Sequence, residues 1–394
     1  MIRRPLATAV CALVAGLALP AGAQADPGPY VALGDSFTAG PLVPNQVGEP
    51  AGCARSDHNY PSIVAAATGV SVFRDRSCSS ATTVHMRSPQ AVTLGSNPPQ
   101  FGGLSGDTAL VTIGIGGNDV GLVGAAVSCL EMGTLAPTGT ACRSHFAKPG
   151  GGDMLVDKIA ATAPKIAATL QAIHLASPQA RVLLVGYPAV APRDGTSCYP
   201  LVPLSDDDMA YLEGMLRRTN AMLAEQAAAN DAEFVDTYEE STGHDVCKPI
   251  GTRWFEGLVP MSLAFPVHPN ALGEASMARS VLRVLGTPRP GPKLGALTRS
   301  KKVIAAGRGL RVSFTLNRAA SVKVVLQRSL GRGHYTRART VGTVAAGIGD
   351  NAVTLTAKRI GSRPGLYRVT AALADGTLSR TQFRIRLTAR RQLR

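Results

Sequence analysis

The stretch that most constrains this chain is an apolar run that stops at a glycine and presents a serine directly afterwards. Residues 30–33 are apolar, and Gly34, Asp35 and Ser36 follow them. Short apolar runs bounded by turn residues are typical of buried parallel strands, and ligands bind beyond the carboxyl ends of such strands. Ser36 is therefore the candidate nucleophile, although Gly, Asp and Ser also form ordinary turns after strands.

Two later stretches supply the other groups that serine chemistry needs. Residues 116–119 (Gly-Gly-Asn-Asp) offer the side-chain amide of Asn118, and residues 267–270 (Val-His-Pro-Asn) offer the imidazole of His268. A serine hydroxyl is a weak nucleophile until a base such as histidine activates it. Together with the Gly-Asp-Ser turn, these blocks resemble those of the SGNH (GDSL-like) hydrolase family, and the resemblance covers residues 28 to 286 approximately.

The resemblance implies a fold and an activity. The family has a flavodoxin-like α/β/α sandwich around a parallel sheet, and its members are carboxylic ester hydrolases with a catalytic serine. Carried over to this chain, the family pattern makes Ser36 the nucleophile and His268 the base. The chain lacks the G-x-S-x-G elbow of α/β-hydrolases, because Phe37 and Thr38 follow the serine.

The partner of the histidine departs from the usual family pattern. Many members carry an Asp three residues before the histidine, whereas this chain has Phe265 there. Some secreted actinobacterial relatives use a backbone carbonyl near this point, so we expect a Ser-His dyad with a carbonyl near Phe265 as the acceptor. Such a carbonyl fixes the tautomer but stabilises the imidazolium less than a carboxylate does. Turnover should rise with pH through a midpoint near about 6.5.

The resemblance also assigns the donors of an oxyanion hole. These are the backbone N–H groups of Ser36 and Ser80 and the side-chain amide of Asn118. Relatives usually have glycine at the position of Ser80, so the backbone conformation there is an open question, although the N–H itself does not depend on the side chain. We expect Asp35 and Asp119 to brace their loops by hydrogen bonding.

Trp254, the only tryptophan, lies shortly before the histidine block. Two roles stay open for it at this stage. It could line a pocket for the acyl group, or it could pack in the interior of the domain.

Residues 1–25 have the features of a secretory signal peptide. Two arginines precede an apolar run of about 14 residues, which is too short to cross a hydrocarbon core of about 30 Å. A small-residue site, Ala-Gln-Ala, ends at residue 25. We therefore expect a secreted, extracellular protein, and association with the cell surface stays open.

Removal of the signal peptide takes Cys11 with it and leaves an even number of cysteines. An even count in a secreted chain implies disulfides, and six cysteines allow fifteen pairings. The resemblance favours the sequential set, which is Cys53–Cys78, Cys129–Cys142 and Cys198–Cys247. A zinc site is disfavoured because no pair has the C-x-x-C spacing and the histidines are scattered. We expect no metal and no other cofactor.

Strand and helix patterns alternate over residues 26–286, which predicts a parallel α/β domain. The expected strands after the first are residues 70–73, 109–115, 181–186 and 233–236, and the expected helices are residues 60–68, 157–176, 206–229 and 270–285.

The charge changes sharply after this region. Residues 1–290 carry 19 Lys and Arg against 24 Asp and Glu, whereas residues 291–394 carry 22 Lys and Arg against two Asp. A stretch rich in Pro and Gly predicts a linker over residues 287–302. Residues 303–394 show five β-like runs, at 310–316, 321–327, 352–357, 366–373 and 381–387, which predict a small β-sandwich.

The basic segment points to an anionic partner. We expect an anionic cell-surface polymer or phospholipid head groups, and not a nucleic acid, because aromatic residues for base stacking are scarce. Two classes of function stay open for the whole chain, which we expect to be a monomer. One is a secreted esterase or lipase acting on lipid, phospholipid or short-chain esters, with a carbohydrate acetyl esterase as a variant. The other is a surface-binding protein whose hydrolase domain is weakly active or idle.

Overall fold

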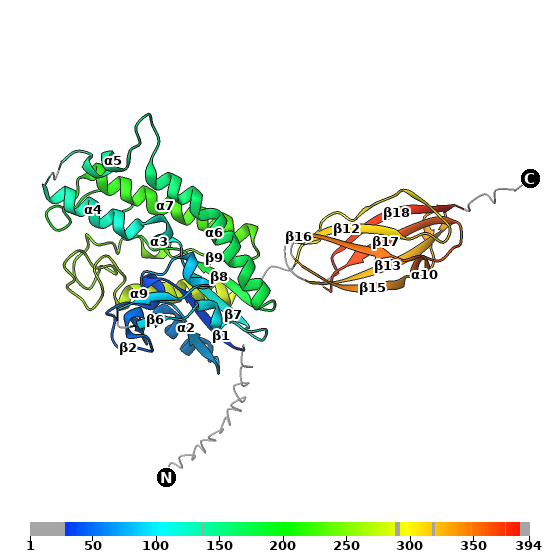
Figure 1. The fold of residues 1–394 in the computed structure, drawn as a ribbon, viewed down its shortest axis with the longest axis horizontal. Coiled ribbons are helices and arrows are strands. Elements are labelled where there is room, and N and C mark those ends of the chain that lie inside the picture. The colour runs from blue at the N-terminus through cyan, green and yellow to red at the C-terminus, as the bar shows by residue number, and fades with distance from the viewer. Residues whose placement is uncertain are drawn as a thin grey trace, which may run out of the picture.

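The computed structural model describes residues 28–93, 95–135, 138–287, 292–316, 320–347, 349–374 and 376–386. The predicted signal peptide and residues 288–291 of the predicted linker lie outside these ranges. Regular structure forms one body before this linker segment and another after it (Figure 1), and each body has its own cluster of buried apolar side chains. The exact division at residues 287–302 stays a proposal.

None of the described helices is long and apolar enough to cross a membrane. Within the same ranges, no group of three or more His, Cys, Asp or Glu side chains is placed to hold a metal ion.

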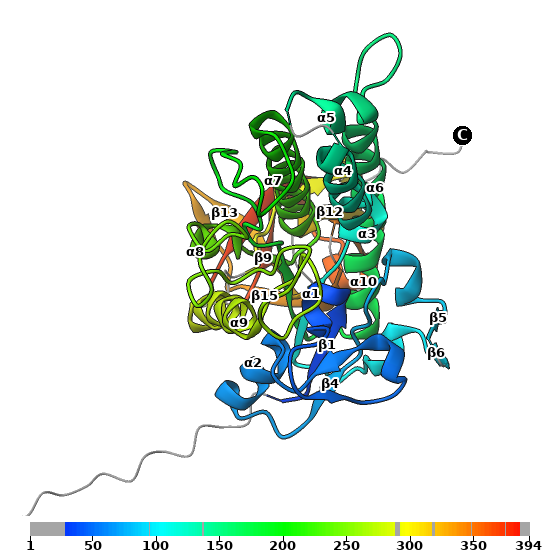
Figure 2. The same cartoon turned by 90° about the vertical axis from the view of Figure 1, so that its left-hand side faces the viewer.

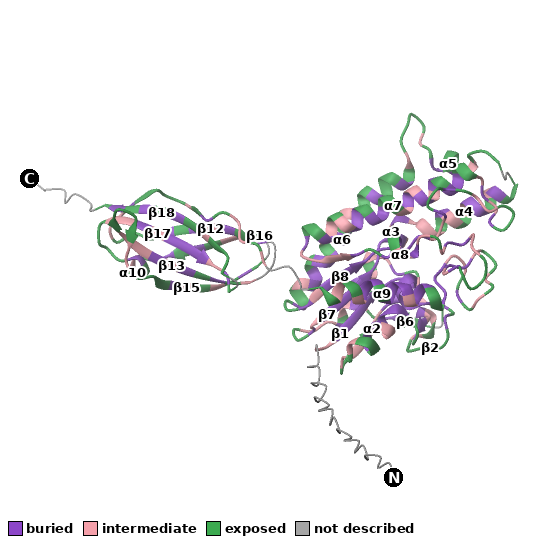
Figure 3. Ribbon diagram, turned by 180° about the vertical axis from the view of Figure 1, so that it is seen from behind, coloured by how far each residue is buried: buried purple, intermediate pink, exposed green. Residues whose placement is uncertain are grey.

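A parallel sheet forms the centre of the first body, with the strand order β4-β1-β7-β8-β9. These strands are β1 (Tyr30–Gly34), β4 (Phe73–Asp75), β7 (Leu110–Gly114), β8 (Arg181–Val185) and β9 (Glu233–Val235). Strands β1 and β7 pair along their full length and are buried throughout, as Figure 3 shows for the middle of this body. Burial on both faces explains why their sequences are apolar without alternation.

Helices cover both faces of this sheet (Figure 2). Helices α2 (Tyr60–Thr68) and α9 (Ala271–Gly286) pack together on one side, and α4 (Leu122–Leu135), α6 (Met154–Ala176) and α7 (Asp206–Ala229) pack on the other. This is the predicted α/β/α sandwich, and α2 and α7 have the predicted bounds. Shorter elements complete the body: α1 (Ser36–Ala39), α3 (Gly117–Val120), α5 (Ala141–Phe146), α8 (Tyr238–Ser241), the 3₁₀ turns η1 (Ala51–Cys53), η2 (Thr83–Met86) and η3 (Gln100–Gly103), and the strand pairs β2 (Gln46–Val47) with β3 (Arg55–Ser56) and β5 (Gln90–Val92) with β6 (Gly95–Asn97).

Some elements differ from the prediction for identifiable reasons. Strand β4 begins at Phe73 and not at residue 70, because its pairing with β1 begins there, opposite Tyr30. Helix α6 begins at Met154 and not at residue 157, because the Asp153 side chain accepts hydrogen bonds from the first N–H groups of the helix. Helix α4 was not expected, since its glycines and alanines dilute the apolar stripe on which a helix prediction depends.

Three disulfides pair Cys53 with Cys78, Cys129 with Cys142, and Cys198 with Cys247. These are the pairs that the family resemblance implied. The Cys53–Cys78 bond ties the turn η1 to the loop that follows β4, and this loop carries Ser80. The long loops of this body are therefore linked covalently to one another, which limits the conformations that they can adopt.

The second body consists mostly of strands in two sheets. One sheet has the order β10-β12-β16, and the other has the order β11-β18-β17-β13-β14 with β15 also paired to β13. Buried side chains from both sheets form one cluster, as in a β-sandwich. The elements are β10 (Thr298–Arg299), β11 (Val303–Ala305), β12 (Leu310–Leu316), β13 (Ala320–Gly331), β14 (His334–Tyr335), β15 (Arg339–Ala346), β16 (Gly349–Leu355), α10 (Ala357–Ile360), β17 (Gly365–Ala372) and β18 (Leu378–Arg386).

The predictions for this body need corrections: one strand ends earlier than expected, and β10, β11, β14 and β15 were not expected. Strand β16 ends at Leu355, and the residues from Ala357 form the short helix α10, where a strand to residue 357 was expected. Strand β15 was missed, because Gly342 and a bulge in its pairing with β13 interrupt the alternation of apolar and polar residues.

Candidate active site

Ser36 lies at the carboxyl edge of the central sheet, as the first residue of helix α1 directly after β1. Asp35 caps this helix, since its Oδ1 accepts the Phe37 N–H at 3.0 Å. The turn requires glycine at position 34, where φ is 150° and a Cβ atom would lie 2.2 Å from the Thr38 hydroxyl. The turn therefore fixes the direction of the Ser36 side chain, and the residue is only 7% exposed.

His268 lies beside this serine, with its Nε2 atom 2.7 Å from Ser36 Oγ. The histidine precedes α9, whose N-cap is Asn270. Two backbone hydrogen bonds of 3.0 Å hold its loop: the Glu256 N–H donates to the His268 carbonyl, and the Val267 N–H donates to the Glu256 carbonyl. The predicted nucleophile and base are thus within hydrogen-bond distance of each other although 232 positions separate them in the sequence.

The other ring nitrogen of His268 binds a backbone carbonyl. Its Nδ1 lies 2.7 Å from the Pro266 oxygen. A carbonyl can only accept, so Nδ1 carries the proton and Nε2 is free to accept the Ser36 hydroxyl hydrogen. The carbonyl that faces the imidazole therefore belongs to the residue after Phe265. Burial lowers the pKa of His268 below its usual value, and the hydrogen bond to Pro266 partly opposes this shift.

The predicted oxyanion donors lie on three neighbouring segments. Asn118 is on α3 and lines the same pocket as Ser36, and its Nδ2 atom donates to the Ala81 carbonyl at 2.9 Å. This bond uses one of its two amide hydrogens. Ser80, the residue before Ala81, has a φ of 64°, which is the left-handed conformation that glycine adopts easily. Within the described ranges, the backbone N–H groups of Ser36 and Ser80 have no acceptor.

Tyr187 is a site residue that the sequence analysis missed. Its hydroxyl donates to Asp35 Oδ2 at 2.5 Å and accepts the Gly117 N–H at 2.7 Å. It therefore connects the turn that carries the serine to the turn that carries the amide. A signal for it existed in the sequence, because it follows β8 at the same edge of the sheet as the other site residues.

The two acidic residues of these turns act as braces, as expected. Burial raises the pKa of Asp35 to about 7, although the hydrogen bonds from Tyr187 and Phe37 oppose the shift. Asp119 accepts both the N–H and the hydroxyl of Thr83, at 2.9 and 2.6 Å. These bonds tie the turn after β7 to the loop that carries Ser80.

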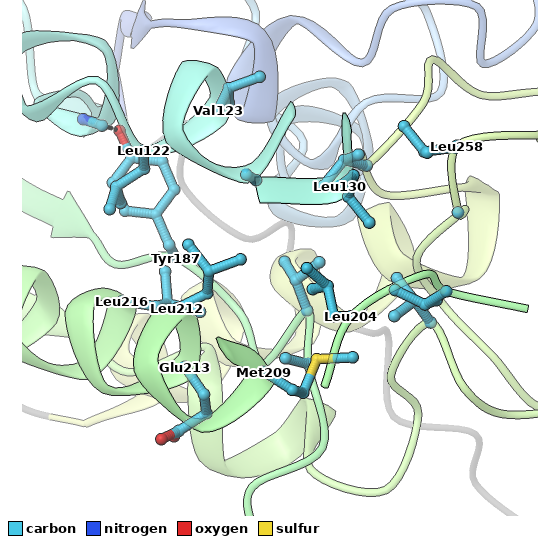
Figure 4. A pocket seen from close by; sticks show the side chains of 18 of the residues that line it. Leu122, Val123, Leu130, Tyr187, Leu204, Met209, Leu212, Glu213, Leu216 and Leu258 are labelled. Carbon is cyan, nitrogen blue, oxygen red and sulfur yellow. Dashed lines mark hydrogen bonds between the residues drawn. The ribbon is translucent and has the colours of Figure 1, made fainter. Parts of the chain in front are cut away.

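An apolar pocket opens beside Ser36 (Figure 4). It encloses about 990 Å³ of space when its open mouth is included. The one acidic side chain labelled in Figure 4, that of Glu213, is hydrogen-bonded to the Tyr238 hydroxyl. Apolar residues from α4, from α7, from the loop before α7 and from the loop before His268 make up most of the wall: Leu122, Val123, Leu130, Leu204, Met209, Leu212, Leu216 and Leu258.

Trp254 is not among the residues that line this pocket. Its ring stacks on that of His244 with 3.6 Å between centroids, and the Arg279 guanidinium lies 5.4 Å from the ring centroid. Of the two roles that the sequence allowed, the structure therefore supports packing and not a contribution to the pocket.

The chain resembles known proteins over most of its first body. The model of the GDSL-like lipase/acylhydrolase family matches residues 32–275. "Lipase 2" of Streptomyces coelicolor is 37% identical over 298 residues, which cover 72% of this chain and 97% of that protein.

Solved structures give the same result for the fold. The extracellular lipase of Streptomyces rimosus is 28% identical, with a TM-score of 0.54, over 65% of this chain and 99% of its own. Phospholipase A1 of Streptomyces albidoflavus is 24% identical, with a TM-score of 0.55, over 65% of this chain and 98% of its own. At this identity the second likeness concerns the fold alone.

The environment of His268 leads to a prediction for its titration. Because burial disfavours the charged imidazolium, the pKa should lie below the usual value of about 6.5, and the ring should stay neutral to lower pH than an exposed histidine. A pH titration of the His268 ring resonances by NMR measures this directly. A midpoint for His268 at or above about 6.5 would contradict the account.

Proposed function

Since this chain belongs to the GDSL-like lipase/acylhydrolase family and is a carboxylic ester hydrolase, we propose that it cleaves fatty acyl esters through an acyl-serine intermediate. Ser36 is the nucleophile in this proposal and His268 is the general base. The observation that carries it is the 2.7 Å contact between Ser36 Oγ and His268 Nε2 at the mouth of an apolar pocket.

The proposed first step forms the acyl-enzyme. Ser36 Oγ attacks the ester carbonyl carbon while His268 Nε2 takes the hydroxyl proton. The same imidazolium then gives that proton to the departing alkoxide, and the alcohol leaves. In the second step a water molecule attacks the acyl-serine, His268 again takes the proton, and the acid is released as Ser36 recovers its hydrogen.

The Pro266 carbonyl replaces the carboxylate of a triad in this mechanism. It accepts the Nδ1 hydrogen and so keeps the ring in the tautomer that can act as a base at Nε2. It also carries a partial charge, and therefore stabilises the imidazolium less than a carboxylate would. Burial lowers the pKa of His268 and so keeps the resting ring neutral, while the hydrogen bond to Pro266 partly opposes this shift.

The tetrahedral intermediate needs donors for its negative oxygen. We assign this role to the N–H groups of Ser36 and Ser80 and to the free amide hydrogen of Asn118. The left-handed conformation of Ser80 supports the assignment, because a non-glycine residue held at positive φ marks a backbone position that the surrounding structure dictates. The Cys53–Cys78 disulfide and the Asp119–Thr83 bonds hold this loop.

The pocket favours a long acyl group over an acetyl group. Its walls are leucines, valines and a methionine from α4 and α7, and burial of each methylene group of a chain is worth about 0.8 kcal/mol. An acetyl group would leave most of this apolar space unfilled. The lining therefore supports a lipase or esterase of lipid substrates over a carbohydrate acetyl esterase.

Secretion and surface attachment belong to the same proposal. The signal-peptide features and the three disulfides are both expected of an extracellular protein. We propose that the C-terminal β body attaches the enzyme to an anionic surface. Its β18 strand supports this role, because Arg380, Arg384 and Arg386 are exposed at alternate positions of one strand.

The catalytic assignment predicts the effect of two substitutions. Ser36→Ala should lower kcat on a soluble p-nitrophenyl ester by about 10⁴-fold or more, because the nucleophile is lost. Asn118→Ala should lower it by about 10² to 10³, because one oxyanion donor is lost. Steady-state kinetics measure both effects.

Folding must be checked in the same proteins. The amide of Asn118 also donates to the Ala81 carbonyl, so the melting temperature of each variant is recorded. Ser88, which is exposed and does not line the pocket, gives the control Ser88→Ala with unchanged kcat. A folded Asn118→Ala protein with wild-type kcat would remove this residue from the oxyanion hole.

The surface-attachment proposal predicts a separable effect. Replacement of Arg380, Arg384 and Arg386 by Gln should weaken retention on anionic vesicles by roughly 10²-fold, since each basic residue near such a surface is worth about 1 kcal/mol. Vesicle co-sedimentation at low and high salt measures it, and salt should weaken wild-type binding. The soluble-ester kcat should not change. Wild-type retention by the variant, or retention that salt does not affect, would contradict an electrostatic anchor.

A further inference from the structure

The loop of residues 257–265, just before the histidine, exposes an unusual amount of apolar surface. Its sequence, Gly-Leu-Val-Pro-Met-Ser-Leu-Ala-Phe, contains no charged residue. Val259, Met261, Leu263 and Phe265 are 76, 62, 68 and 47% exposed. Single exposed apolar residues are common, but four in one short loop indicate a binding surface.

A buried ion pair, Arg253–Glu256, holds the backbone of this loop. The Glu256 carboxylate accepts the N–H groups of Met261 and Ser262 at 2.9 and 3.3 Å. Arg253 binds the same carboxylate at 2.8 Å, and both members of the pair are almost completely buried. Because the backbone at the middle of the loop is tied to this pair, its apolar side chains are presented to solvent and do not fold back into the core.

This apolar loop is continuous with the pocket. Gly257 and Leu258 at its start line the pocket beside Ser36. At its other end the Phe265 N–H donates to the Pro41 carbonyl at 3.0 Å, which places the loop against the segment of the exposed Leu42. Leu201, which also lines the pocket, is 57% exposed. We call Leu42, Leu201, Val259, Met261, Leu263 and Phe265 the apolar rim.

We propose that the apolar rim docks on the surface of a lipid aggregate and that the enzyme draws its ester substrate from that surface. The inference rests on the proposed function, because it is the acyl pocket that gives the rim a lipid as its partner. Because the rim carries no charge, its side chains can be buried among the acyl chains of a lipid layer, and anionic head groups do not strengthen its binding. Burial of its side chains removes apolar area from water, which is the driving force of docking.

The apolar rim and the basic β body are therefore proposed to bind surfaces through different interactions, the rim through apolar burial and the β body through charge. Attachment through arginines weakens as salt is raised, because salt screens exposed charges. Docking through the rim depends on buried apolar area, so it persists at high salt and on vesicles without net charge. Zwitterionic phosphatidylcholine vesicles at high salt therefore report on the rim alone.

The test uses the full-length protein and substitutions of residues that do not line the pocket. Met261→Ser/Leu263→Ser removes two exposed side chains of the rim and leaves the backbone bonds to Glu256 in place. Leu175→Ser is the matched control, since Leu175 is 84% exposed on α6 and lies outside both the rim and the pocket lining. Val259→Ser is a second, milder rim variant. Melting temperatures confirm that all variants fold.

The double variant should bind phosphatidylcholine vesicles at least about tenfold more weakly than the wild type in a co-sedimentation assay. It should lose a similar factor in turnover of an aggregated long-chain ester and keep its kcat and KM on a soluble short-chain ester. The control should match the wild type in all three measurements. Wild-type vesicle binding by the double variant would overturn the proposal.

Two other outcomes would also overturn it. If the wild type forms a dimer that the double variant does not form, and neither binds vesicles, the rim is an interface between copies of this chain. If soluble-ester turnover falls as much as vesicle turnover, the rim acts within the catalytic site. A failure of the proposed function can be distinguished from a failure of the docking proposal, because co-sedimentation measures vesicle binding without any ester turnover.

Discussion

The imidazole of His268 is held between two hydrogen bonds, and the rest of the site is arranged to keep both of them. One bond joins it to Ser36 Oγ and the other to the Pro266 carbonyl, each at 2.7 Å. The serine depends on the turn after β1, at the edge of a rigid buried sheet. The histidine depends on a loop that the buried Arg253–Glu256 pair fixes at its base. In the proposed mechanism this hydroxyl and this imidazole are the nucleophile and its base, and the Pro266 carbonyl orients the ring in place of a carboxylate.

The same loop connects catalysis to substrate access. Its end leads to His268, its start lines the apolar pocket, and its middle forms much of the apolar rim. Glu256 holds two parts of this region. Its backbone pairs with that of the histidine segment, and its carboxylate accepts a hydrogen bond from the middle of the loop. If the rim docks on lipid as we propose, the bound lipid lies next to the pocket and to Ser36.

The sequence predicted which two residues the structure brings together, Ser36 and His268, better than it predicted what surrounds them. Ser36 and His268 lie in short motifs whose local geometry, a strand end and a helix start, is encoded within a few residues, so both could be named in advance. Helices α2 and α7 could be delimited because capping residues and continuous helix-forming sequence mark their ends. Tyr187 could not be found in this way, because its role depends on contacts with residues 70 and 152 positions away.

The same reason explains the other limits of the prediction. A backbone carbonyl near Phe265 could be expected, but which carbonyl faces the ring depends on the path of the loop. The acyl pocket lies between α4 and α7, two helices far apart in the sequence, and α4 itself gave no clear pattern. The sequence of residues 257–265 shows a run without charge. That its apolar side chains are exposed became clear only from the structure, in which the Arg253–Glu256 pair holds the backbone of this loop.

The central claim is that Ser36 and His268 form a working dyad without an acid. The most direct measurement is the rate at which a fluorophosphonate, which modifies activated serines, labels the full-length protein across pH, with the modified peptide identified by mass spectrometry. The account predicts a single adduct on the peptide that contains Ser36. The labelling rate should rise with pH through one ionisation below about 6.5, because burial lowers the pKa of His268. Labelling of another residue, or an equal rate of Ser36 labelling in a folded His268→Ala protein, would contradict the account.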